Sequence, residues 1–260
     1  MIPAVQAKLL EGKRGLVVGI ANEHSIAWGC AKAFRAFGAE VAVTYLNDKA
    51  RPYVEPLAQE LQAPIFLPCD VQDDAQVDAL SAALRERWGR LDFALHAVAF
   101  APKPDIQGRL TDSSREGFLT AMDISCHSFI RLARRAEPLL TDGGTLLTLS
   151  FAGAERVVQN YDLMGPVKAA LECAVRYLAY ELGPKGIRVH ALSPGPIHTR
   201  AASGLKDFDT IILEEQRKTP LGRLAEIDDV GAMAAFLTTP AARAITGMTI
   251  YVDGGYHIMS

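Results

Sequence analysis

The sequence has few cysteines and no long uninterrupted apolar run. Its four cysteines, Cys30, Cys69, Cys126 and Cys173, stand singly in apolar segments, without C-x-x-C spacing or the density of a disulfide scaffold. They are typical of small core residues in a reducing compartment. No apolar run reaches the ~18 residues of a membrane span, and residues 1–14 do not resemble a signal peptide. These absences predict a cytoplasmic protein that does not act in a membrane.

The chain also lacks a block of charge of one sign. Its net charge is −3 over 260 residues, with both signs interspersed, so no basic face is expected to bind nucleic acid. No linker or low-complexity stretch divides it, and 49% of its residues are hydrophobic. We therefore expect one domain over residues 1–260, with ample core and no metal site.

Short strand-like runs, the first of them the β-branched run at 15–20, alternate with segments of helical periodicity along the whole chain. The pattern predicts strands at 15–20, 41–45, 64–67, 91–98, 144–149, 187–192 and 249–252, and helices at 26–37, 50–61, 75–88, 115–140, 161–182 and 227–237. This alternation indicates an α/β fold, a Rossmann-type doubly wound parallel sheet of about seven strands with helices on both faces. In such sheets ligands bind beyond the carboxyl ends of the strands.

Tyr161 and Lys168 stand seven residues apart at the start of the expected helix 161–182. At 3.6 residues per turn this spacing puts both side chains on one face, roughly 10 Å apart along the axis. An ammonium near a phenol favours the phenolate and can bind cofactor hydroxyls, so that the tyrosine steadies an oxyanion or transfers a proton. Any helix can carry such a pair by chance, so the neighbouring motifs decide its meaning.

The loops after the predicted strands offer further candidates. Gly19 ends the first strand, and Ser25 and Ile26 follow where a pyrophosphate meets a helix N-terminus. The loop lacks the three glycines of G-x-G-x-x-G, so an ordinary loop with Ser25 as N-cap fits equally well. Asp70, after the third strand, suits an adenine amino group or a plain turn.

Two later loops complete the set of candidates. Residues 96–101, after the fourth strand, are mostly small, so a flat cofactor ring and a substrate can approach the backbone. Residues 193–197 form an extended turn after the sixth strand, and His198 and Thr199 follow with groups suited to an amide or phosphate. A rigid loop explains residues 193–196 equally well.

These residues together resemble the short-chain dehydrogenase/reductase superfamily, and within it the NADH-dependent enoyl-acyl-carrier-protein reductases of bacterial fatty-acid synthesis. The Tyr–Lys spacing of seven marks this branch, because ordinary members of the superfamily use a spacing of four. The similarity runs from end to end: Gly19, 25–27, 44–49, 69–71, 100–102, 153–156, 160–168, 194–197, 201–208 and 252–255.

The resemblance implies hydride transfer from NADH to the β-carbon of a trans-2-enoyl thioester, which leaves an enolate. Tyr161 would bind the thioester oxygen as a catalytic and substrate-binding residue, with Ala101 also near the substrate, and Lys168 would bind the nicotinamide ribose. The residues implied in cofactor binding are Gly19, Ser25, Ile26, Leu46, Asp70, Val71, Val98, Lys168, Ile197, His198, Thr199, Arg200 and Ala201. A segment at about 198–215 would cover the acyl chain.

Two positions depart from the family pattern. Phe151 replaces the second tyrosine of many relatives, so Tyr161 or water must supply the proton. Leu46 replaces a polar residue near the adenosine ribose, which puts that ribose contact in doubt. No arginine stands at 45–48 to bind a 2′-phosphate, and Asp48 would repel one, which favours NADH over NADPH. Lys49 and Arg51 are the cations that would weaken this preference.

Two other functions fit parts of the sequence. A carbonyl reductase acting on a 3-oxoacyl thioester would use the hydroxyl of Ser150, and a catalytically silent dinucleotide sensor would explain Phe151. Retention of both Tyr161 and Lys168 speaks against the sensor. The apolar segments 246–252 and 256–259 indicate burial between subunits, and the resemblance implies a homotetramer of dihedral symmetry.

Overall fold

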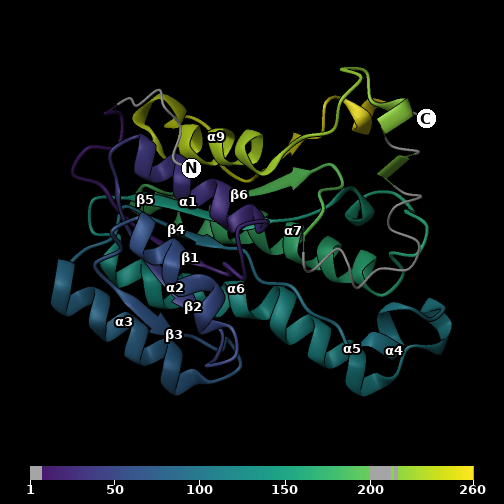
Figure 1. Ribbon diagram of the computed structural model, residues 1–260, viewed down its shortest axis with the longest axis horizontal. Coiled ribbons are helices and arrows are strands. Elements are labelled where there is room, and N and C mark those ends of the chain that lie inside the picture. Colours follow the sequence, from purple (N-terminus) through teal and green to yellow (C-terminus); the bar gives the residue numbers. More distant parts are fainter. Residues whose placement is uncertain (1–7, 200–211, 214–215, 260) are drawn as a thin grey trace.

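A parallel sheet runs through the centre of the molecule in the computed structural model, which describes residues 8–199, 212–213 and 216–259. Its seven strands lie in the order β3-β2-β1-β4-β5-β6-β7, and each pair is parallel. The strands are β1 (Arg14–Val18), β2 (Glu40–Tyr45), β3 (Phe66–Pro68), β4 (Phe93–His96), β5 (Gly144–Leu149), β6 (Ile187–Pro194) and β7 (Met248–Val252). The predicted doubly wound, single-domain fold is confirmed (Figure 1).

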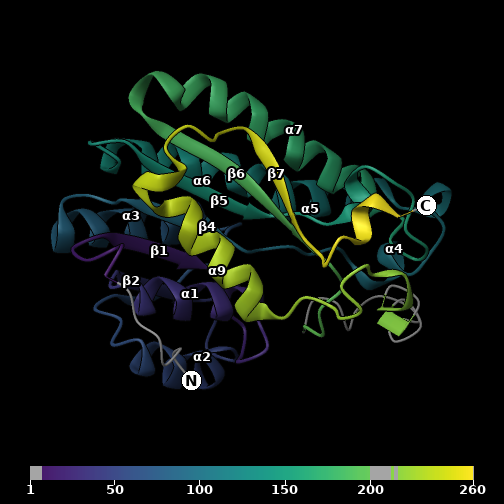
Figure 2. The ribbon, with the colours of Figure 1, turned by 90° about the horizontal axis from the view of Figure 1, so that it is seen from above.

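Helices cover both faces of this sheet. Those that the argument needs are α1 (Ile26–Ala36), α2 (Arg51–Glu60), α3 (Asp74–Trp88), α4 (Lys103–Ile106), α5 (Arg115–Met122), α6 (Ser128–Ala136), α7 (Met164–Leu182) and α9 (Ile227–Thr238). The apolar core has two parts: α1, α2 and α9 pack on one face, and α3, α6 and α7 pack on the other. Figure 2 shows α1 and α9 together on one side of the strands and α7 on the opposite side.

The central strands are apolar toward both layers, as a covered parallel sheet requires. Leu16 of β1 belongs to the core under α7, whereas its neighbour Val17 belongs to the core under α1. Leu146 and Leu147 of β5 repeat this alternation, and all four side chains are at most 1% exposed. The strand ends are thereby fixed relative to one another, and the loops beyond them meet at one edge.

Two predicted helices differ from the structure. The segment 115–140 is α5, a π-helical turn at Asp123–His127, α6 and a short 3-10 turn, rather than one continuous helix. The predicted helix 161–182 begins only at Met164, so Tyr161 lies in the preceding turn. The expectation that Tyr161 and Lys168 share a helix face is therefore wrong.

The four thiols are free, as the isolated cysteines predicted, although Cys173 is only partly buried. Burial raises the pKa of Cys30 to about 12 and that of Cys69 to about 11, so both remain neutral and serve as core residues. Among the residues that the structure describes, no helix has the length and apolarity needed to cross a bilayer.

Candidate active site

The carboxyl ends of β1 and β4 lie side by side at the point where the strand order reverses. Gly19 follows β1 with φ +114°, a conformation that favours glycine. A Cβ added there would lie 2.2 Å from Ala97 O in the loop after β4. The two loops are therefore in backbone contact, and the glycine is required at the place where the sequence predicted a cofactor to approach.

Ser25 serves the loop between β1 and α1. It precedes α1 as the N-cap residue, and its hydroxyl accepts hydrogen bonds from Ala21 N at 3.0 Å and Asn22 N at 3.1 Å. The hydroxyl thus shapes the loop before the helix, and although Ser25 occupies the N-cap position, its side chain makes no capping hydrogen bond to α1. Ile26 opens the helix, so its backbone lies at the positive end of the α1 dipole.

The turn after β3 is also shaped by its own side chain. Asp70 Oδ1 accepts a hydrogen bond from Gln72 N at 3.0 Å, which makes Asp70 a turn residue whatever else it binds. Val71 is buried. Leu46, at the end of β2, is 52% exposed, so a contact between this side chain and a ribose would be apolar.

Tyr161 is held in a constrained turn before α7. Its neighbours Asn160 and Asp162 have φ values of +61° and +27°, which few residues other than glycine adopt. The Tyr161 ring packs against Phe151, with ring centroids 4.8 Å apart. The side chain is only 8% exposed, and burial raises the pKa of its phenol above the ordinary value, with a smaller contribution from Glu172. Burial thus opposes the phenolate that a nearby ammonium would favour, and the protonated phenol can steady an oxyanion or transfer a proton.

Lys168 projects from the first turns of α7 toward the end of β5. Its ammonium donates to Leu149 O at 2.7 Å, and the residue is 5% exposed. Burial lowers its pKa to about 8, although Cys126 and Glu172 act in the opposite direction. Since an ammonium carries three donors, the bond to Leu149 O fixes the head group and leaves capacity for ribose hydroxyls.

Glu172 follows Lys168 by one turn of α7 and is also buried. Its carboxylate accepts a hydrogen bond from the hydroxyl of Ser150, directly after β5. Burial raises the pKa of Glu172, and the bond from Ser150 partly offsets this effect. Ser150, the hydroxyl that a carbonyl reductase would use, is thus committed to a buried carboxylate.

The segment after β4 is fixed by the π-helical turn. Ser125 Oγ accepts from Phe100 N at 2.9 Å and donates to Phe100 O at 3.0 Å, so it holds the backbone next to Ala101. Ala101 is buried and Val98 is partly buried. His96, the last residue of β4, lies 2.7 Å from Ser128 Oγ through Nε2. Burial lowers the pKa of His96 to about 3, so the ring stays neutral under the site.

The loop after β6 carries the remaining predicted contacts. Ile197 and Thr199 are partly buried and His198 is exposed. Arg200 and Ala201 lie outside the described residues, as does most of the predicted substrate-covering segment at about 198–215. The structure therefore brings the loops of β1, β3, β4 and β6 and the start of α7 to one edge of the sheet.

Three residues that support this edge were assigned no role from the sequence. Gly153 makes room for the tyrosine ring, because a Cβ there would lie 2.3 Å from Tyr161 Cδ1. Ser125 and Glu172 act through contacts with Phe100 and Ser150, at sequence separations of 25 and 22. Only Gly153 left a sequence signal, since it belongs to the family-like motif 153–156.

Comparison with known proteins identifies the family. The model of the family described as "Enoyl-(Acyl carrier protein) reductase" matches residues 19–257. The chain belongs to this family. The match includes every candidate site residue, from Gly19 to the loop after β6, and confirms the resemblance inferred from the motifs.

Individual members of the enoyl-(acyl carrier protein) reductase family are similar over nearly the whole chain. "Enoyl-[acyl-carrier-protein] reductase [NADH] 2" of Rhizobium meliloti is 48% identical over 252 residues, which are 97% of this chain and 94% of the relative. The Anaplasma phagocytophilum reductase, crystallised in complex with NAD, has a TM-score of 0.94 and 49% identity over 98% of this chain and 97% of its own. The Bacillus cereus reductase, crystallised with NADP+ and indole naphthyridinone, has a TM-score of 0.95 and 43% identity, with coverages of 97% and 99%.

Proposed function

We propose that this protein is an NADH-dependent enoyl-acyl-carrier-protein reductase of fatty-acid elongation. The single observation that carries the proposal is the buried pair of Tyr161 and Lys168 at the strand ends of a chain that belongs to the reductase family. The substrate is a trans-2-enoyl thioester on acyl carrier protein, and the product is the saturated thioester. NADH supplies the hydride when it is bound.

The loops at the switch point fit a dinucleotide. A Cβ at Gly19 would collide with Ala97 O, so only glycine lets the loops after β1 and β4 lie in direct backbone contact at that position. Gly19, Ser25 and Ile26 would bind the pyrophosphate, Asp70 and Val71 the adenine, and Leu46 the adenosine ribose. Lys168 would hold the nicotinamide ribose. Val98 and Ile197, His198, Thr199, Arg200 and Ala201 would lie along the nicotinamide side.

Tyr161 acts on the substrate through its hydroxyl. Because burial keeps the phenol protonated, it donates a hydrogen bond to the thioester oxygen, on which charge grows as the enolate forms. Ala101 lines the substrate side, beside the segment that Ser125 fixes. Phe151 carries no hydroxyl and packs on Tyr161, so the proton that completes the reduction comes from Tyr161 or from water.

The cofactor preference rests on charge near the end of β2. Asp48 would repel a 2′-phosphate, and Arg51 is paired with Glu55 at 3.0 Å, which reduces its availability for a phosphate. The cation of Arg51 also lies 5.8 Å from the centre of the Tyr45 ring. We therefore propose NADH as the preferred donor over NADPH. Comparable kcat/KM values for the two donors would contradict this preference.

The function is tested by mixing the protein with NADH and crotonyl thioester and following the loss of NADH absorbance. Acetoacetyl thioester, assayed in parallel, tests reduction of a 3-oxo group. We expect turnover of the crotonyl substrate and little of the acetoacetyl one, because Ser150 is engaged with Glu172. The reverse preference would identify a carbonyl reductase. Binding of NADH with turnover of neither substrate would indicate a dinucleotide sensor.

We propose that the enzyme is a cytoplasmic homotetramer of dihedral symmetry. Tyr177 and Tyr180 on α7 are 72% and 86% exposed. Met248, on β7 at the edge of the sheet, and Ile258, near the chain end, are exposed as well. Such apolar side chains at an outer helix and an edge strand favour burial between subunits.

A further inference from the structure

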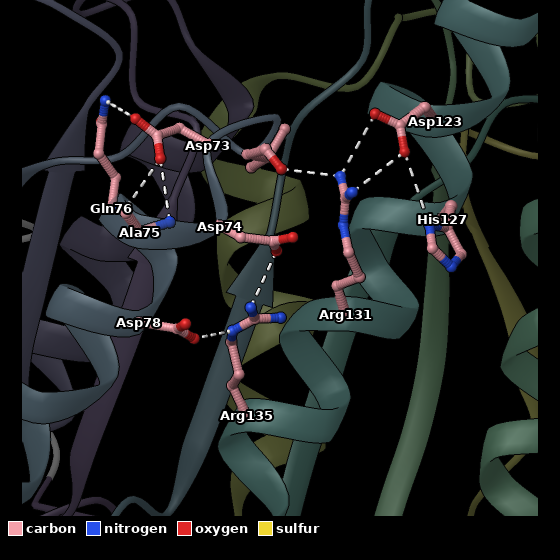
Figure 3. A network of polar contacts seen from close by, with 10 residues as sticks. Asp73, Asp74, Ala75, Gln76, Asp78, Asp123, His127, Arg131 and Arg135 are labelled. Atoms are coloured by element: carbon pink, nitrogen blue, oxygen red, sulfur yellow. Dashed lines mark hydrogen bonds and ion pairs between the residues drawn. The ribbon is translucent and has the colours of Figure 1, made fainter.

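A partly buried arginine of α6 reaches the turn after β3. Arg131 donates from Nη2 to Val71 O at 2.8 Å, across 60 positions of sequence. Its Nη1 lies 3.2 Å from Asp123 Oδ1, which orients the guanidinium, and Asp123 also lies 3.5 Å from His127 Nδ1. Figure 3 shows Arg131 and His127 directed toward Asp123 from neighbouring turns. Arg131 and Val71 also line one small cavity, so the contact lies against the core.

The same turn is held from its other side by α3. Asp70 N donates to Gln76 Oε1 at 2.9 Å, and Gln76 Nε2 donates to Asp73 Oδ2 at 2.9 Å. The backbone on both sides of the Asp70–Val71 peptide is therefore tied to a helix, on one side by a neutral amide and on the other by a cation. A hydrogen bond from a guanidinium is about twice as strong as a neutral one. Arg131 thus supplies the stronger of the two ties.

Arg135 joins α6 to α3 through ion pairs that do not involve Arg131. It lies one turn further along α6 and contacts Asp74 Oδ1 at 2.9 Å and Asp78 Oδ1 at 2.6 Å. In Figure 3 its guanidinium lies between these two carboxylates of α3. Both arginine side chains are 19% exposed. The two arginines therefore have the same helix, charge and burial. They differ in their partners, because Arg131 contacts the backbone of the turn after β3 and Arg135 contacts side chains of α3.

We propose that Arg131 is a positioning residue for the adenosine half of the cofactor. This inference rests on the proposed function, which places Asp70 and Val71 against the adenine. Loss of the guanidinium would leave Val71 O without its charged donor inside the protein, and the turn would shift to reach another donor or water. The nicotinamide half would be unaffected, because Tyr161 and Lys168 are held by α7, Gly153 and the end of β5.

The test is Arg131→Met, which keeps a long apolar stem and removes the donor. We expect NAD+ and ADP-ribose, titrated by calorimetry, to bind about tenfold more weakly, within the range common for coupled sites. The KM for NADH should rise by a similar factor, whereas kcat at saturating NADH stays at the wild-type value. Arg131→Lys, which restores a cationic donor, should recover part of the lost affinity.

Arg135→Met is the matched control, because it removes the same charge from the same helix without touching the turn. Its affinity for ADP-ribose should equal that of the wild type. Equal weakening in both variants, or a fall in kcat for Arg131→Met, would overturn the inference in favour of a general role in helix docking. Unchanged ADP-ribose binding in Arg131→Met would overturn it outright.

A second variant covers the case in which Arg131→Met does not fold. Asp123→Asn keeps Arg131 and weakens the carboxylate that orients it, so ADP-ribose binding should weaken by a smaller factor. Wild-type affinity in Asp123→Asn would then overturn the inference. Wild-type protein that binds neither NAD+ nor ADP-ribose would instead refute the proposed function, so the two failures are distinguishable.

Discussion

At the scale of single residues, the position of Tyr161 depends on an unusual backbone. Asn160 and Asp162 on either side of it have positive φ values, which cost of order 1–3 kcal/mol each at positions without glycine. The sequence identified the tyrosine by its spacing and motif. It did not reveal the turn, because the apolar periodicity of α7 extends back to Tyr161. In the structure the helix begins only at Met164, after the two residues with positive φ.

Tyr161→Phe tests the role of the hydroxyl. The ring still fits between Phe151 and the space at Gly153, so the fold and NADH binding should be retained. We expect kcat to fall by about 10²–10⁴-fold, the range for a lost acid–base group. Steady-state kinetics with crotonyl thioester measures this change, and near-normal turnover would remove Tyr161 from the mechanism.

The lowered pKa of Lys168 predicts that kcat/KM for NADH falls on the alkaline side of its pH profile. Its pKa of about 8 is below the ordinary value of 10.5, so the ammonium is present below pH 8 and is lost as the pH rises through it. Because kcat/KM reports on the free enzyme, kcat/KM for NADH should decline above about pH 8. Lys168→Arg keeps its charge at these pH values, and its profile should lack this decline. Persistence of the decline in Lys168→Arg would assign it to another group.

At the scale of elements, α1 and α9 meet at their backbones. A Cβ on Gly29 would lie 2.1 Å from Ile227 O, and one on Gly231 would lie 2.3 Å from Gly29 O. The close approach fixes α9 on the sheet and positions the start of α1, which faces the proposed pyrophosphate site. Neither glycine stood out in the sequence, because an isolated glycine in a helix has no visible partner.

Gly231→Ala should separate these two helices. We expect the free energy of unfolding to fall by about 1–3 kcal/mol, the usual effect of adding a methyl group to a packed contact. Thermal unfolding measures it, with Gly183→Ala as control: Gly183 has φ −54° and nothing within 4 Å of an added Cβ. Equal melting temperatures for both variants would show that the α1–α9 contact adapts without cost.

The segment between 115 and 140 shows what local pattern can and cannot predict. Its helical periodicity predicted a long helix, and most of it is helical. The π-helical turn at Asp123–His127 was not predicted, because it is fixed by contacts distant in sequence, such as the two bonds between Ser125 and Phe100. The same holds for Arg131, whose distinguishing partner is the backbone of Val71.

At the scale of the whole molecule, topology was the most predictable property. All seven strands lie where short apolar runs alternate with helical segments, because a parallel strand needs a covering crossover before the next one. The site as a set of loops follows from that order. The individual contacts within it do not, since a one-residue change in a turn leaves the alternation unchanged.

The proposed tetramer would bury the exposed side chains on α7, on β7 and near the chain end. We expect light scattering at micromolar concentration to give the mass of a tetramer, four times 28.1 kDa. Tyr180→Glu would place a charge on the exposed face of α7 and should favour smaller species. A monomer mass for the unmodified protein would contradict the proposed assembly.

The order of the strands has a consequence for how such a protein can evolve. The loops proposed for the pyrophosphate and adenosine follow β1, β2 and β3, whereas Tyr161 and Lys168 depend on β5 and α7, on the other side of the switch point. Mutations that retune donor choice therefore arise in a different part of the sheet from mutations that retune the acyl substrate. Selection can therefore change the acyl substrate while cofactor binding stays nearly intact, so one ancestral fold can give enzymes with different substrates and the same cofactor.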